Sequence, residues 1–192
     1  MSDRPDHNSD KAEPPKPGPG EARLAEMLRV DHAGEYGAVA IYRGQQAVFN
    51  ALPHKAETAA AIAEMEAGEE EHLKTFDRLL AEKNIRPTLL APLWNVAGFG
   101  LGAATALMGE KAAMACTAAV EDVIEKHYGE QAKALGEDEP ELAATITQFR
   151  EDELGHKHTA EEAGAEAAPG YTLLAGVIRA GCRAAIKIAE KV

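Results

Sequence analysis

Two short stretches of the sequence carry the same residue types at the same spacing, Glu69-x-x-His72 and Glu153-x-x-His156. Side chains three residues apart lie on one face of a helix, so each pair can offer a carboxylate and an imidazole to one metal ion. A chain this rich in glutamate contains such a pair by chance, so the flanking residues have to decide. The apolar residues before the two pairs repeat at one spacing, Ile62 and Met65 before the first and Ile146 and Phe149 before the second.

Each pair also follows a lone glutamate, Glu35 in the first half of the chain and Glu121 in the second. A tyrosine stands seven residues after each of them, Tyr42 after Glu35 and Tyr128 after Glu121. Similar elements that recur at a fixed interval indicate an internal repeat. The sequence therefore predicts a duplicated helical hairpin, each copy carrying half of a site.

The elements that must position these residues are helices. From Ala22 onward apolar residues recur at helical spacing, and no segment alternates convincingly as a strand would. Proline and glycine end the predicted helices, which cover roughly residues 22–51, 55–84, 110–135 and 138–165. The predicted fold is all-α, a ferritin-like four-helix bundle built from the duplicated hairpin.

The candidate ligands stand within apolar stripes and are therefore predicted to face the interior of the bundle. An unpaired carboxylate buried there would cost several kcal/mol or take up a proton. Two divalent metal ions would balance four carboxylates if both histidines are neutral. Oxygen-rich ligands with one imidazole per metal favour iron or manganese over zinc. This pattern predicts two iron ions that activate dioxygen, held by Glu35, Glu69, His72, Glu121, Glu153 and His156.

A solvated helix face is the alternative explanation, since Glu69-Glu70-Glu71 is a run of charges. We assign Glu66, Glu70 and Glu71 to solvent. We do not assign Glu69 to solvent, because the apolar context of the candidate ligands occurs four times.

Three residues beside the ligands are further candidates for a functional role. Tyr128 lies two turns from Glu121 on the same helix face and could orient a substrate or relay an electron, or only pack the bundle. Gly34 and Gly37 flank Glu35 inside a helix, where each glycine costs about 0.5–1 kcal/mol relative to alanine. Approach of oxygen, of a substrate ring or of a neighbouring helix would explain them, and so would helix packing alone.

Residues 87–109 contain no charged side chain and are numerous enough to span a membrane. A span would place Glu69 and Glu121 on opposite sides of the bilayer, which one shared site forbids. We therefore predict an apolar crossover helix that returns along the bundle and contacts a membrane or lines a lipid site. A dinucleotide-binding interpretation of Gly98, Gly100 and Gly102 is rejected, because no strand precedes them; close helix packing explains them better.

The chain ends in a basic helix that carries Arg179, Arg183, Lys187 and Lys191 among apolar residues. Such an amphipathic helix favours an anionic membrane surface. The alternative is a docking helix whose bases complement its own C-terminal dipole.

Composition restricts the remaining possibilities. A chain of 192 residues with 45% apolar content predicts one domain, residues 21–192, and a net charge of −12 argues against nucleic acid as a partner. Cys116 and Cys182 form no disulfide framework, which fits a reducing compartment. Residues 1–20 are rich in proline and charge and predict a disordered tail without a secretory or organelle signal, as in a bacterial cytosolic protein.

Three segments resemble a known family, RVDHAGEYGA at 29–38, MACTAAVE at 114–121 and EDELGH at 151–156. Over about residues 22–192 the chain is similar to the demethoxyubiquinone hydroxylases of ubiquinone biosynthesis. The resemblance implies the same six iron ligands and hydroxylation of the ring of a polyprenylated benzoquinol. It also implies a peripheral position on the membrane, here the cytoplasmic side of the cell membrane, with biosynthetic partner proteins. Electrons would come from NADH or from the quinol itself.

Two other functions share parts of this pattern. A ferritin-like ferroxidase or iron-handling protein would use the same ligands without an organic substrate, but it needs neither the apolar crossover nor the basic terminal helix. A scaffold protein without catalytic activity would not need six intact ligands.

Overall fold

The structure of the protein, a computed structural model, describes residues 20–191. The predicted N-terminal tail, residues 1–20, lies outside this range except for Gly20. The described residues form helices and no strand, which confirms the predicted all-α class. The elements are α1 (Glu21–Phe49), η1 (Pro53–Lys55), α2 (Ala56–Glu82), α3 (Ala91–Leu107), α4 (Glu110–Leu135), α5 (Pro140–Glu162), η2 (Ala165–Ala167) and α6 (Tyr171–Ala189).

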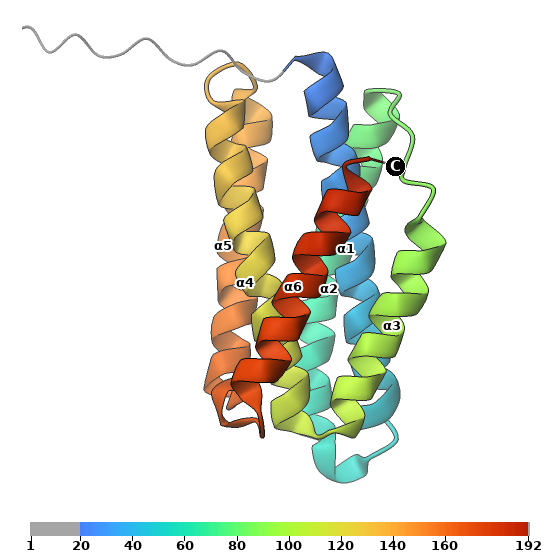
Figure 1. The fold of residues 1–192 in the computed structure, drawn as a ribbon, viewed down its shortest axis with the longest axis vertical. Coiled ribbons are helices and arrows are strands. Elements are labelled where there is room, and N and C mark those ends of the chain that lie inside the picture. The colour runs from blue at the N-terminus through green and yellow to red at the C-terminus, as the bar shows by residue number, and fades with distance from the viewer. Residues whose placement is uncertain (1–19, 192) are drawn as a thin grey trace, which may run out of the picture.

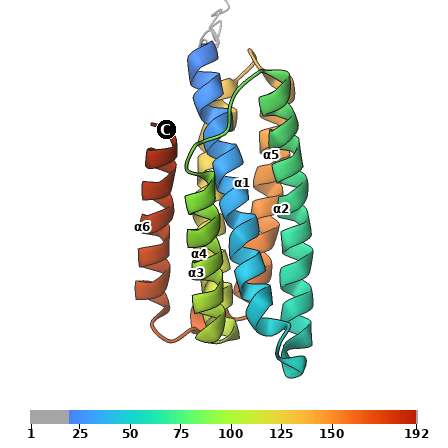
Figure 2. The same ribbon diagram turned by 90° about the vertical axis from the view of Figure 1, so that its right-hand side faces the viewer.

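Helices α1, α2, α4 and α5 form the bundle, while α3 packs along α1 and α6 packs along α4 on the outside (Figure 1). The two hairpins are α1–α2 and α4–α5. Figure 2 shows that α2 and α4 run in the same direction, so the chain has to return between them. Helix α3 makes this return, as was predicted for the apolar crossover helix. None of the helices between residues 20 and 191 is both long and apolar enough to cross a membrane.

The crossover is helical over a shorter range than the predicted residues 87–109. Helix α2 stops at Glu82, and a non-helical connection leads to Ala91. At the other end Gly109 adopts φ 114°, a left-handed backbone conformation that favours glycine and separates α3 from α4. The sharp reversal between these helices therefore depends on a residue without a side chain.

The core consists of apolar clusters on either side of the candidate ligands. One cluster includes Tyr42, Phe49 and Ile62, toward the end of α1 and the start of α2. Another includes Leu28 and Phe76, toward the opposite ends of the same helices. The charged residues in the middle of each helix are thus enclosed by apolar layers that exclude water.

Glycines allow α1 and α3 to approach closely. A Cβ atom on Gly102 would collide with the carbonyl oxygen of Ile41, and one on Gly98 would lie 2.7 Å from the carbonyl oxygen of Gly37. A Cβ atom on Gly100 would meet nothing within 4 Å. Close helix packing therefore explains Gly98 and Gly102 but not Gly100.

The contact predicts opposite effects for two alanine substitutions in α3. Gly102→Ala forces α3 away from α1, and we expect it to lower the free energy of unfolding by about 1–3 kcal/mol. Gly100→Ala is the matched control, since alanine favours the helix there and should raise stability slightly. Urea unfolding followed by circular dichroism measures both, and equal stabilities would contradict the close approach.

Candidate metal centre

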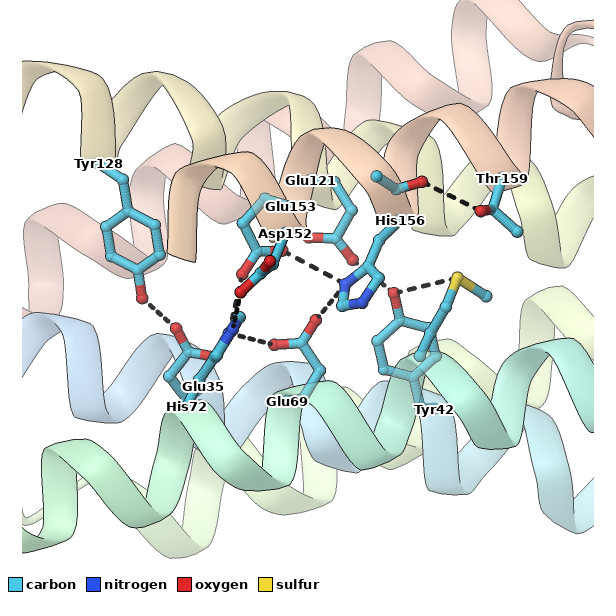
Figure 3. A network of polar contacts seen from close by, with 12 residues as sticks. Glu35, Tyr42, Glu69, His72, Glu121, Tyr128, Asp152, Glu153, His156 and Thr159 are labelled. Atoms are coloured by element: carbon cyan, nitrogen blue, oxygen red, sulfur yellow. Dashed lines mark hydrogen bonds and ion pairs between the residues drawn. The ribbon is translucent and has the colours of Figure 1, made fainter. Parts of the chain in front are cut away.

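Four helices bring the six predicted ligands together in the middle of the bundle (Figure 3). Helix α1 supplies one glutamate, α4 supplies another, and α2 and α5 each supply a glutamate and a histidine from one face. The four carboxylates are at most 1% exposed. The residues are Glu35, Glu69, His72, Glu121, Glu153 and His156.

The ligand atoms form two overlapping groups, each spanning no more than 4.8 Å. Glu69 and Glu153 belong to both groups. Glu35 and His72 complete the first, which we call the His72 position, and Glu121 and His156 complete the second, the His156 position. Two metal ions at these positions would share the carboxylates of Glu69 and Glu153.

Several ligand atoms are buried without a hydrogen-bond partner among the described residues. They are one oxygen each of Glu35, Glu69 and Glu121, both oxygens of Glu153, and Nδ1 of His72. A buried polar atom without a partner costs about 1–3 kcal/mol, and more when it is charged. Metal ions would satisfy all of these atoms at once. The oxygen-rich donor set with one imidazole per position fits iron or manganese.

Two tyrosines cross-link the halves of the site. The Tyr42 hydroxyl donates a hydrogen bond to Oε1 of Glu121 at 2.6 Å, and the Tyr128 hydroxyl donates to Oε1 of Glu35. Each tyrosine therefore holds the lone glutamate of the other hairpin. Burial raises the pKa of both phenols, so they keep their protons as donors. Sequence reasoning gave Tyr42 no role, although its place in the repeat matched that of Tyr128.

The pKa values of the lone glutamates are shifted upward. Burial, and next the charge of Glu69, raises the pKa of Glu35 well above its ordinary value. Burial and the charge of Glu153 have the same effect on Glu121. Without a metal, both carboxyl groups are therefore driven to hold protons.

The pKa values of the two histidines are raised, which favours the positively charged form of each ring. Burial would lower the pKa of His156, but the neighbouring carboxylates of Glu153 and Glu69 outweigh it and raise the pKa to about 10. The pKa of His72 is raised by the same carboxylates against the effect of burial. Burial would raise the pKa of Glu69, yet the adjacent imidazoles of His156 and His72 lower it to about 2. Protons on the site thus replace the charge that metals would bring.

An apolar cavity of about 370 Å³ lies between α1, α3, α4 and α6. Gly34 and Gly37 line it, and a Cβ atom on either would meet nothing within 4 Å. Packing alone therefore does not require these glycines. Gly34 and Gly37 flank Glu35 on α1, and the lining residues Val120 and Ile124 flank Glu121 on α4. The cavity therefore lies against the turns of α1 and α4 that carry Glu35 and Glu121.

These pKa shifts predict that metal binding releases protons. A metal ion needs Glu35 and Glu121 as carboxylates and His72 and His156 as neutral imidazoles. Because the pKa of each group is raised, each is protonated more readily and must lose its proton to the metal. We expect Fe²⁺ added without oxygen to acidify a weakly buffered solution, and its affinity to fall as pH is lowered. A pH-independent affinity would contradict the assignment.

Comparison with known proteins agrees with the predicted resemblance. The chain is 51% identical over 179 residues to the 3-demethoxyubiquinol 3-hydroxylase of Rhodospirillum rubrum, covering 93% of this chain and 82% of that protein. It is 48% identical over 174 residues to the mitochondrial NADPH-dependent 3-demethoxyubiquinone 3-hydroxylase of Mus musculus, covering 88% and 78%. It is 40% identical over 187 residues to the mitochondrial 5-demethoxyubiquinone hydroxylase of Saccharomyces cerevisiae, covering 89% and 79%.

A family model described as ubiquinone biosynthesis protein COQ7 matches residues 22–189, nearly the whole described chain. This match confirms the family that the three sequence motifs had indicated. The chain belongs to the COQ7 family of ubiquinone biosynthesis proteins.

Proposed function

We propose that the protein is a di-iron monooxygenase that hydroxylates the ring of a polyprenylated demethoxybenzoquinol in ubiquinone biosynthesis. One observation carries the proposal: the bundle of a COQ7-family chain encloses two groups of candidate ligand atoms, several of which are buried without a hydrogen-bond partner. Two iron ions, when bound, would supply the activation of dioxygen.

The residues of the chain supply binding, orientation and the exclusion of water. Glu69 and Glu153 would hold both metals, because they belong to both groups of ligand atoms. Tyr42 and Tyr128 fix the rotamers of the lone glutamates through their hydrogen bonds. The apolar clusters on either side keep bulk water from the reacting groups. Tyr128 therefore acts here as a hydrogen-bond donor to a ligand as well as packing the core.

The apolar cavity is the proposed binding site for the quinol. Its walls are formed almost entirely by aliphatic side chains and glycine, which suits a polyprenyl chain. The glycines beside Glu35 leave room for a ring close to the turns that hold the ligands. A ferroxidase has no use for such a cavity, which is why we favour the hydroxylase.

Electrons have to come from an external reductant. The Mus musculus relative is named as NADPH-dependent, so we propose a reduced nicotinamide as the donor, either NADPH or the NADH that the family resemblance suggested. Residues 20–191 contain no strand and hence no strand–turn–helix unit to bind a dinucleotide. The nicotinamide would therefore act without such a unit within residues 20–191.

A peripheral position on the membrane, on its cytoplasmic side, is also proposed. Large apolar side chains are exposed on the two outer helices and beside them, among them Leu89, Leu93 and Val96 near α3 and Leu173 and Val177 on α6. Both helices line the cavity, so a lipid substrate could pass from a bilayer directly into it.

The basic face of α6 is smaller than the sequence suggested. Arg179 forms an ion pair with Asp122 of α4 at 3.0 Å and is half-buried, so it serves docking. Arg183, Lys187 and Lys191 are exposed and remain available for anionic headgroups. Both explanations of the basic helix thus apply, to different residues.

The proposed function predicts the reaction product and the substitution that abolishes the reaction. Purified protein loaded with Fe²⁺ should bind about two irons per chain, because the ligand set of this bundle class holds two metal ions. It should then hydroxylate demethoxyubiquinol when oxygen and NADPH or NADH are supplied. Glu153→Ala removes a ligand from both positions and should abolish turnover, whereas Glu151→Ala, an exposed neighbour, should leave it unchanged. Iron oxidation without ring hydroxylation would favour the ferroxidase instead.

A second variant in the same assay separates the cavity from the metals. Gly34→Leu fills the cavity without removing a ligand, so it should retain iron but lose turnover of the polyprenyl substrate. Gly176→Leu on α6 is the control, because Gly176 is exposed and does not line the cavity. Full activity of Gly34→Leu would rule out this binding site.

Membrane contact predicts that charge on the outer helices weakens binding to vesicles. Burying one leucine contributes about 1.5–3 kcal/mol, so Leu93→Glu combined with Leu173→Glu should reduce binding at least about tenfold. Ala144→Glu combined with Thr147→Glu adds the same two charges at exposed positions of α5 and should have little effect. Sedimentation with vesicles containing an anionic lipid measures this, and unchanged binding of the double variant would exclude the surface.

A further inference from the structure

Asp152 lies beside the metal centre without belonging to either group of ligand atoms. It precedes Glu153 on α5, and its Oδ2 accepts a hydrogen bond from Nε2 of His72 at 3.2 Å across the bundle (Figure 3). Its other oxygen accepts a hydrogen bond from Gln148 at 3.0 Å. The Asp152 side chain is 40% exposed and that of His72 only 4%, so a carboxylate near the surface holds a buried ring.

The hydrogen bond between His72 and Asp152 directs Nδ1 of His72 toward the candidate metal centre. Nδ1 of His72 lies 3.3 Å from Glu153 and 3.6 Å from Glu35. A neutral imidazole that donates through Nε2 has its lone pair on Nδ1, where a metal requires it. Phe149 stacks on the same ring with centroids 3.9 Å apart. Asp152 therefore selects the tautomer of the ring, while Phe149 limits its rotation.

The second histidine of the site, His156, lacks a contact equivalent to the one between His72 and Asp152. Gly68 stands before Glu69 as Asp152 stands before Glu153. A Cβ atom on Gly68 would lie 3.1 Å from Nε2 of His156, so the glycine occupies the equivalent place beside the second ring. Within residues 20–191, Nε2 of His156 has no hydrogen-bond partner; only its Nδ1 does, with Glu69 at 2.9 Å.

We infer that Asp152 is a positioning residue that makes the two metal positions unequal, the His72 position binding its ion more tightly. The inference rests on the proposed metal centre. The two hairpins match in their glutamates, histidines and tyrosines and differ at residue 68 against residue 152. A carboxylate behind a ligand imidazole raises the basicity of the ring and fixes its orientation, and its loss costs about 10–100-fold in metal affinity. The ring of His156 has to be oriented without this support.

Titration of the metal-free full-length protein with Co²⁺, followed by visible absorption, tests the inference. Wild type should bind two ions in distinguishable steps with different spectra. Asp152→Ala should weaken the tighter step by about 10–100-fold and leave the weaker step nearly unchanged. Asp152→Asn keeps an acceptor oxygen without the charge, so its loss should be smaller. Glu151→Ala, at an exposed site one residue away, should reproduce wild type.

The reciprocal variant acts on the other ring. Gly68→Ala places a methyl group against His156 and should weaken the second step alone. Thermal unfolding of each metal-free variant identifies a merely structural effect, which would lower stability and weaken both steps together. Equal affinities at the two positions of wild type, or equal weakening of both steps in Asp152→Ala, would overturn the inference. Failure of wild type to bind Co²⁺ at all would instead overturn the metal centre itself.

Discussion

Four carboxylates buried in the middle of one helical bundle are the constraint on which the rest of the structure depends. Such charges cannot remain unpaired in an apolar interior, so cations or protons have to accompany them. The chain provides partial compensation with two histidines whose pKa values are raised and two tyrosines that donate to the lone glutamates. The many oxygens left without partners show that this compensation is incomplete. Divalent metal ions would complete it.

The topology follows from the way in which the two hairpins are arranged around the buried carboxylates. Each hairpin brings two carboxylates and one imidazole, and the two hairpins face each other with α2 and α4 parallel. A parallel pair requires a return connection, and α3 provides it along α1. The close contact through Gly98 and Gly102 lets α3 lie on the bundle, while its remaining surface is free to line a cavity. The connection that the topology requires is thereby part of a binding site for an apolar molecule.

The sequence predicted the six residues at the centre because helical periodicity assigns each side chain to a face of its own helix. Contacts between helices depend on their rotation and separation, which periodicity does not determine. The hydrogen bond from Tyr42 to Glu121 and that from His72 to Asp152 were missed for this reason. The cavity was missed as such, because it belongs to four helices at once. The predicted tail and the domain limits remain predictions.

Two adjacent residues of α4, Glu121 and Asp122, face the inside and the outside of the bundle and have different roles. Glu121 points to the metal centre, so the next residue of α4 points outward, where it forms ion pairs with Lys126 at 2.8 Å, Lys157 at 2.6 Å and Arg179 at 3.0 Å. Burial would raise the pKa of Asp122, but hydrogen bonds from these lysines lower it to about 2, so the carboxylate stays ionised. Helix α6, one wall of the cavity, is thus held by ion pairs beside Glu121, a candidate metal ligand. Because the fastening is ionic and partly exposed, high salt weakens it more than it weakens the apolar core.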